Sequence, residues 1–110
     1  MRFVFLIAIL LGVKATGFTQ DHAALVNARL LARMTDSLQL DPLQVYRIDS
    51  INNALTVQKN MLRLEFTNID SLTKHIQLVE RSRDSLYQIV LPFPTYFIYK
   101  EKKRNLISNN

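Results

Sequence analysis

The sequence predicts an all-α fold, in which a long antiparallel helical hairpin is flanked by short helices. Apolar residues recur at intervals of three or four positions over most of the chain, which is the period of one helix face. The 110 residues include only two Gly and three Pro, whereas an all-β fold needs a turn residue about every 8–12 positions. Neither Gly nor Pro occurs between Leu43 and Leu91, so this stretch can form long uninterrupted helices.

The first segment has the layout of a secretory signal peptide. One positive charge precedes the uncharged apolar run 3–13, and small residues follow shortly after it. This run is shorter than the roughly 17–25 residues that a membrane-spanning helix needs. We therefore expect residues 1–19 to be removed on export, with cleavage after Gly17 or Thr19, and residues 20–110 to form the mature helical domain.

A first short helix is predicted from Asp21 to Leu38, with Asp21 as its N-cap. The stretch contains no Gly or Pro and carries an apolar face at helical spacing. The residues of this face are Ala24, Leu25, Ala28, Leu30, Leu31, Met34 and Leu38.

The clearest helix start follows, at Leu40-Asp41-Pro42-Leu43-Gln44. The Asp41 carboxylate can accept hydrogen bonds from free backbone N–H groups, and Pro42 falls at the first helical position, where its missing N–H does no harm. Gln44 lies three residues after the cap and can complete a capping box. Leu40 is expected to pack against the first turn as a hydrophobic staple.

The long stretch that follows carries two apolar seams with the 3–4 alternation that is typical of paired helices. The seams consist of Ile48, Ile51, Leu55, Leu62 and Phe66, and then of Ile69, Leu72, Ile76, Val79, Arg83, Leu86 and Val90. Turn-forming residues cluster near 67–70, which predicts helices over 42–66 and 70–90, with Asp70 as the second cap. A single continuous helix is the alternative. Arg83 is expected either to pair with an acidic residue across the hairpin or to mark a cationic face.

Two prolines, Pro92 and Pro94, are expected to end the second long helix. A final helix is predicted over 95–106, with Thr95 as its cap. Its aromatic residues form one block and its basic residues form the next. In surfaces that bind nucleic acid, basic and aromatic side chains are usually interleaved, so this order does not favour nucleic-acid binding. We expect a solvated basic helix end, with peripheral membrane contact as the alternative.

The motif L-D-P-L-Q at 40–44, opening a long helix in a small exported chain, resembles the LTxxQ motif of the Spy/CpxP-type periplasmic proteins, with Asp in place of Thr. The stretch 91–96 resembles a degenerate second copy, which keeps Leu91 and Tyr96. The resemblance covers most of residues 21–104 in layout and about five residues in strict motif. In style the chain is similar to members from Bacteroidetes-type bacteria.

This resemblance implies a periplasmic helical hairpin, often paired as a homodimer, that binds proteins and catalyses no reaction. The implied activity is that of an ATP-independent chaperone or envelope-stress modulator for unfolded or partner proteins, without a cofactor. The implied client-binding surface comprises Arg83, Tyr96, Phe97, Lys100 and Lys103. A metal-responsive relative and a structural coiled-coil interaction protein are the alternatives.

Composition excludes several kinds of catalytic site. With no Cys, the chain has no disulfide, thiolate metal site or cysteine nucleophile, and two Gly cannot supply a phosphate-binding loop. His22 and His75 are the only histidines, and His75 has no His, Asp or Glu three or four residues away. We predict no catalytic residue; a metal site shared across a dimer by both histidines and carboxylates is the alternative. The formal charge of +5 falls to about +3 once the signal segment is removed.

Overall fold

The computed structural model describes residues 22–108, and every regular element within this range is an α-helix. The N-terminal helix covers 22–38, and α2 (Pro42–Glu65), α3 (Ile69–Val90) and α4 (Phe93–Ser108) follow. The all-α prediction is therefore confirmed for this part of the chain. None of its helices combines the length and the hydropathy needed to cross a bilayer. The predicted signal peptide and the Asp21 cap lie outside the described residues.

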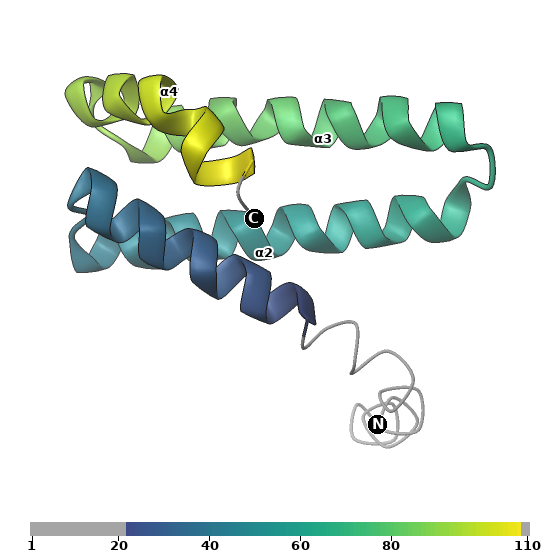
Figure 1. Cartoon of the computed structure of the whole chain (residues 1–110), viewed down its shortest axis with the longest axis horizontal. Helices are drawn as coiled ribbons and strands as arrows, with labels where there is room; N and C mark the ends of the chain where they lie inside the picture. The colour runs from purple at the N-terminus through teal and green to yellow at the C-terminus, as the bar shows by residue number, and fades with distance from the viewer. Residues whose placement is uncertain (1–21, 109–110) are drawn as a thin grey trace, which may run out of the picture.

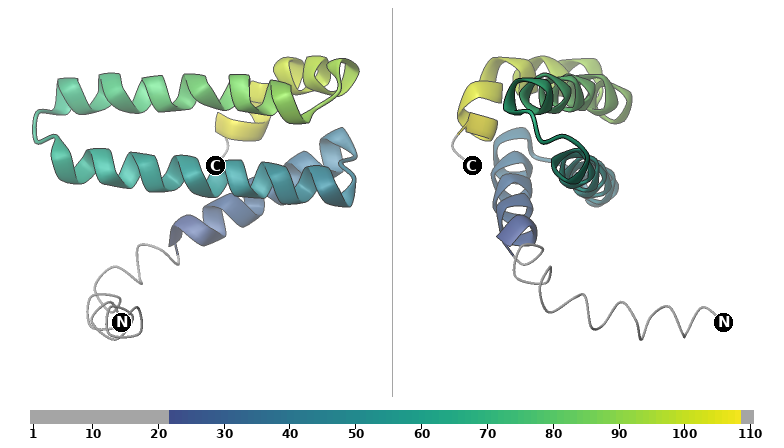
Figure 2. Two further views of the ribbon diagram at one scale, coloured as in Figure 1. Left: turned by 180° about the vertical axis from the view of Figure 1, so that it is seen from behind. Right: turned by 90° about the vertical axis from the view of Figure 1, so that its right-hand side faces the viewer.

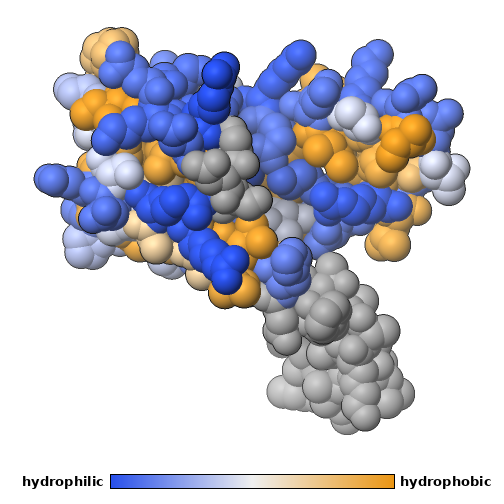
Figure 3. Space-filling view, in the orientation of Figure 1, coloured by the Kyte–Doolittle hydropathy of each residue, from blue (hydrophilic) through white to orange (hydrophobic). Residues whose placement is uncertain are grey.

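The helices α2 and α3 run side by side in opposite directions and are joined by residues 66–68 (Figure 1). The N-terminal helix and α4 both lie on one face of this pair, as the end-on view in Figure 2 shows. They cover the half of the pair where α2 begins and α3 ends (Figure 1). Figure 3 shows hydrophobic residues over the other half of the same face, which these two helices leave uncovered.

The hydrophobic core lies at the covered end of the helix pair. Its buried members come from all four helices and their connections: Leu30, Met34, Leu38, Leu40, Ile48, Tyr87, Leu91, Tyr99 and Leu106. Tyr87 and Tyr99 meet edge to face with ring centroids 5.0 Å apart. No residue between 56 and 82 is buried. We call residues 56–82 the distal half of the α2–α3 pair.

The N-terminal helix buries a narrower face than the sequence predicts. Leu30, Met34 and Leu38 are buried, whereas Ala24 and Ala28 are exposed, because only the C-terminal half of this helix lies over the core. It ends in a left-handed turn, with Gln39 at φ 54° and the Leu40 amide donating to the Thr35 carbonyl at 3.3 Å. This bond is the outer hydrogen bond of a Schellman motif, usually built with Gly at the left-handed position.

The predicted start of α2 is confirmed in detail. The Gln44 amide donates to Asp41 Oδ1 at 2.8 Å, and the Asp41 amide donates to Gln44 Oε1 at 2.9 Å. Pro42 occupies the first helical position. Leu40 is buried, and Val45 of the first turn packs against the same core.

Two predicted caps are wrong. Asn68, not Asp70, caps α3: its Oδ1 accepts the Ser71 amide at 3.0 Å, and Asp70 lies in the first turn. Helix α4 starts at Phe93, two residues before the predicted cap Thr95. Pro94 does not delay this start, because the N–H that proline lacks has no intrahelical partner in the first turn.

Candidate functional site

A chain of polar side chains crosses the interface between α2 and α3. Nη1 of Arg83 donates to Asn52 Oδ1 at 2.8 Å and to Tyr87 Oη at 3.1 Å, and the Tyr87 hydroxyl also donates to Asn52 Oδ1. Nε and Nη2 of Arg83 donate to the two carboxylate oxygens of Glu80, at 3.0 and 3.2 Å. Lys59 of α2 forms an ion pair with the same carboxylate. We call these five residues the polar seam.

Burial and pairing compete at the Glu80 carboxylate. Burial by itself would raise its pKa, but the hydrogen bonds from Arg83 and Lys59 outweigh burial and hold the pKa below its ordinary value. Glu80 is therefore charged at neutral pH. Burial raises the pKa of Tyr87, so its hydroxyl stays protonated and can donate.

The buried groups of the polar seam restrict how α2 and α3 can pair, because leaving these groups without hydrogen-bond partners is costly. Two donors converge on Asn52 Oδ1, which turns Nδ2 into a buried position without a hydrogen-bond partner among the described residues. Arg83 keeps its ion pair with Glu80 in any register, because both lie on α3, but a buried donor that loses its hydrogen-bond partner costs about 1–3 kcal/mol. A shifted pairing of α2 and α3 would separate Arg83 from Asn52. We infer that the polar seam fixes the register of the two helices.

The structure corrects the expectation for Arg83. The residue is only 4 % exposed, so Arg83 does not belong to an exposed client-binding surface. Its acidic partner, Glu80, lies one turn away on the same helix, and the residue that it reaches across the interface is Asn52. The signal was present in the sequence, because Asn52 stands between Ile48 and Leu55 at helical spacing and is therefore a polar residue at a core position.

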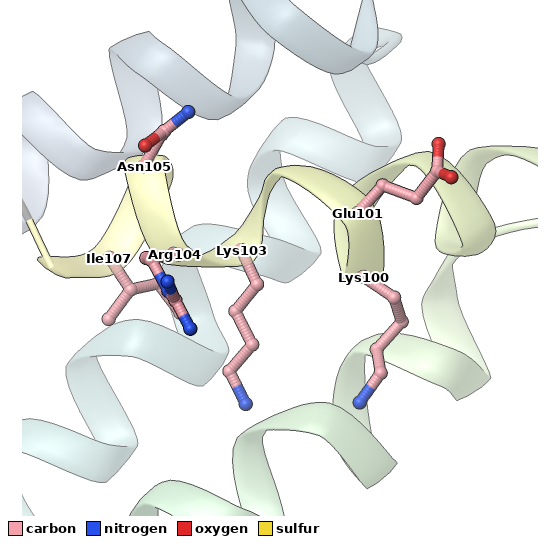
Figure 4. Close-up of a pocket in the computed structure, with 6 residues that line it drawn as sticks. All are labelled: Lys100, Glu101, Lys103, Arg104, Asn105 and Ile107. Carbon is pink, nitrogen blue, oxygen red and sulfur yellow. The ribbon is translucent and has the colours of Figure 1, made fainter.

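A second cluster fastens α4 to α3 at Asp84. The Tyr99 hydroxyl donates to Oδ1 at 2.8 Å, and the ammonium groups of Lys100 and Lys103 lie 3.0 and 2.8 Å from Oδ2. Figure 4 shows both lysines leaving α4 on one side, opposite to Glu101. Burial would raise the pKa of Asp84, but hydrogen bonds from Lys103, Tyr99 and Lys100 lower it overall. We call these four residues the Asp84 clamp.

The other predicted surface residues differ in their accessibility. Tyr96 is half-buried and packs against the core. Phe97 is 53 % exposed and lies beside Phe93, with ring centroids 6.4 Å apart. Lys100 and Lys103 remain partly exposed although both pair with Asp84. Their role in client binding stays a prediction.

The two histidines lie on different helices, His22 on the N-terminal helix and His75 on α3. His22 is exposed on the N-terminal helix. His75 is half-buried, stacks on Phe66 at 4.2 Å between ring centroids, and its Nδ1 donates to the Ser71 carbonyl at 2.7 Å. Within residues 22–108 no three His, Cys, Asp or Glu side chains are grouped so as to hold a metal ion.

Helix α2 carries a second apolar stripe, which the sequence analysis missed. Its members are all more than half exposed: Leu43 (56 %), Tyr46 (69 %), Val57 (56 %), Met61 (62 %) and Leu64 (88 %). At about 100° per residue they fall within an arc of about 60°, on the side of α2 opposite to its buried residues. We call these five residues the outer stripe. The sequence signal was the 57–61–64 spacing, which a search for a single seam per helix passes over.

Comparisons of the chain with protein-family models, with curated proteins and with solved structures find no match.

Proposed function

We propose that this chain is an exported periplasmic protein that binds unfolded or partner proteins through apolar surface and catalyses no reaction. The observation that carries the proposal is the outer stripe. The stripe has two parts, Leu43 with Tyr46 and Val57 with Met61 and Leu64, which are separated by the exposed polar residues Ser50 and Asn53. Exposed apolar patches that are rimmed by polar residues mark interaction sites. The signal-peptide layout of the first residues supports export.

The outer stripe suits reversible binding. Burying one large apolar side chain contributes about 1.5–3 kcal/mol, so these five partly exposed side chains would contribute about 5–10 kcal/mol when covered. Association itself costs about 4–15 kcal/mol. The balance favours weak contacts that are made and lost easily, which is appropriate for holding a client without trapping it.

An aggregation assay tests this function. The purified protein is added at stoichiometric amounts to a chemically denatured model protein, and light scattering is followed. We expect suppression by the wild type and its loss in the double variant Met61→Lys and Leu64→Lys. The double variant Thr73→Lys and Gln77→Lys is the matched control, since it adds the same two positive charges at exposed positions of the same distal half. If the wild type leaves aggregation unchanged, the proposal is wrong.

A second candidate is a structural homodimer in which a second copy covers the outer stripe. Arg47 and Glu65 flank the stripe along one side in a self-complementary order. Two antiparallel copies of α2 that cross at the level of Thr56 bring Arg47 opposite the second copy's Glu65. Neither of these two residues forms an ion pair within residues 22–108.

Sedimentation velocity separates the two candidates. A dimer that Met61→Lys converts to a monomer supports occupation of the stripe by a second copy. A monomer that still suppresses aggregation supports client binding and removes the homodimer.

A further inference from the structure

A cleft of about 430 Å³ opens where the four helices meet. The N-terminal helix contributes Val26 and Leu30, and α4 contributes Ile107, which form an apolar patch on a wall that also includes His22 and Asn27. The opposite wall comes from α2 and α3. Small-molecule sites in proteins have volumes of about 300–1,000 Å³ and combine apolar walls with a few polar groups. The cleft includes no residue of the outer stripe.

Positive charge is in excess on the polar wall. Lys59, Arg63 and Arg83 line the cleft together with a single carboxylate, that of Glu80. Glu80 already pairs with both Lys59 and Arg83, and its lowered pKa keeps it charged. Three cations against one anion leave two positive charges in excess at neutral pH.

Donor capacity remains at the cleft mouth. A guanidinium has five N–H donors and an ammonium has three. Within residues 22–108, Arg63 donates one hydrogen bond, to Asn60 Oδ1 at 2.7 Å, and forms no ion pair. Lys59 uses one donor, toward Glu80, and its side chain is 21 % exposed. Arg83, in contrast, is held by the polar seam.

We propose that this cleft binds a carboxylate attached to a short apolar group. The carboxylate would accept hydrogen bonds from Arg63 and Lys59, and the apolar group would lie against Val26, Leu30 and Ile107. A planar carboxylate matches the paired donors of a guanidinium better than other small anions of the same charge. Two sources carry this chemistry: a free medium-chain carboxylate, and the C-terminal residue of a peptide that ends in an apolar side chain.

Titrations of the purified protein, followed by amide chemical shifts, test the proposal. The probes are octanoate, with octanol and octylamine as uncharged and oppositely charged controls, and a short peptide ending in Leu with either a free or an amidated carboxyl group. We expect saturable shifts around Val26 and Arg63 for octanoate, for the free-carboxyl peptide, or for both, which identifies the source. Arg63→Gln should weaken this binding about tenfold. Arg81→Gln is the matched control, since it removes the same charge from an exposed residue that does not line the cleft.

Three results would overturn the carboxylate site. The first is no saturable shift with either carboxylate probe. The second is octanol or the amidated peptide binding as tightly as its charged counterpart. The third is an equal loss of affinity in Arg63→Gln and Arg81→Gln. None of these results depends on suppression of aggregation, so they leave the proposed client binding untouched.

Discussion

Removal of the Asp84 carboxylate should loosen α4 from α3. Tyr99 is completely buried, and in Asp84→Ala its hydroxyl loses its partner, which costs about 1–3 kcal/mol. The side chains of Lys100 and Lys103 are 46 % and 37 % exposed, so solvent screening limits each ion pair to about 0.5 kcal/mol. We expect Asp84→Ala to lower the free energy of unfolding by about 2–4 kcal/mol, mostly through Tyr99.

Urea and thermal denaturation, followed by far-UV circular dichroism, measure this loss. For a domain of this size, each kcal/mol lowers Tm by about 4–8 °C. A double-mutant cycle with Tyr99→Phe isolates the hydroxyl–carboxylate contact, and we expect a coupling energy of about 1–2 kcal/mol. Asp36→Ala is the control, because Asp36 is exposed and its carboxylate forms no ion pair with the described residues. Additivity of the two single variants within about 0.5 kcal/mol would refute the reasoning.

The same carboxylate makes stability depend on pH. The folded state holds the pKa of Asp84 below its ordinary value of 3.8, so the unfolded chain takes up the proton first as pH falls. The contribution of the Asp84 carboxylate to the free energy of unfolding is complete at pH values above 3.8 and is lost as pH falls through the lowered pKa of the folded state. The wild type should therefore lose more stability than Asp84→Ala between about pH 5 and pH 2. Parallel loss in both proteins would contradict this assignment.

Two further variants test the helix ends. Asp41→Ala removes the carboxylate that accepts the Gln44 amide and should lower the free energy of unfolding by about 1 kcal/mol in urea denaturation; no loss relative to Asp36→Ala would contradict the cap. Gln39→Gly relieves a left-handed residue that bears a side chain and should raise the free energy of unfolding by about 0.5–1 kcal/mol. A lower urea midpoint for Gln39→Gly would show that the Gln39 side chain stabilises this turn.

The helix boundaries were predicted well where the signal involves only a few neighbouring residues. The cap at Asp41, Pro42 and Gln44 depends only on a four-residue motif, and it forms as predicted. The second cap was misplaced by two residues, because Asn68 and Asp70 are both good capping residues and the local sequence does not rank them. The left-handed Gln39 had no signal, since this conformation usually selects Gly or Asn.

The site could be predicted less completely, because its members come from different helices. Arg83 and Glu80 are close in sequence, but Asn52 is 31 residues away from Arg83, and their contact depends on how α2 packs on α3. The Asp84 clamp likewise depends on the path of α4. The outer stripe could have been predicted from the sequence, since its residues all belong to one helix.

The absence of buried residues between 56 and 82 has a consequence for local unfolding of this molecule. Amides near the connection at 66–68 should exchange with solvent through local fraying, while those beside Tyr87 and Tyr99 exchange only when the whole domain opens. The hairpin connection can therefore open locally without disturbing the core. The end of the domain that holds the core is thus its most stable part, and the hairpin connection is where opening begins.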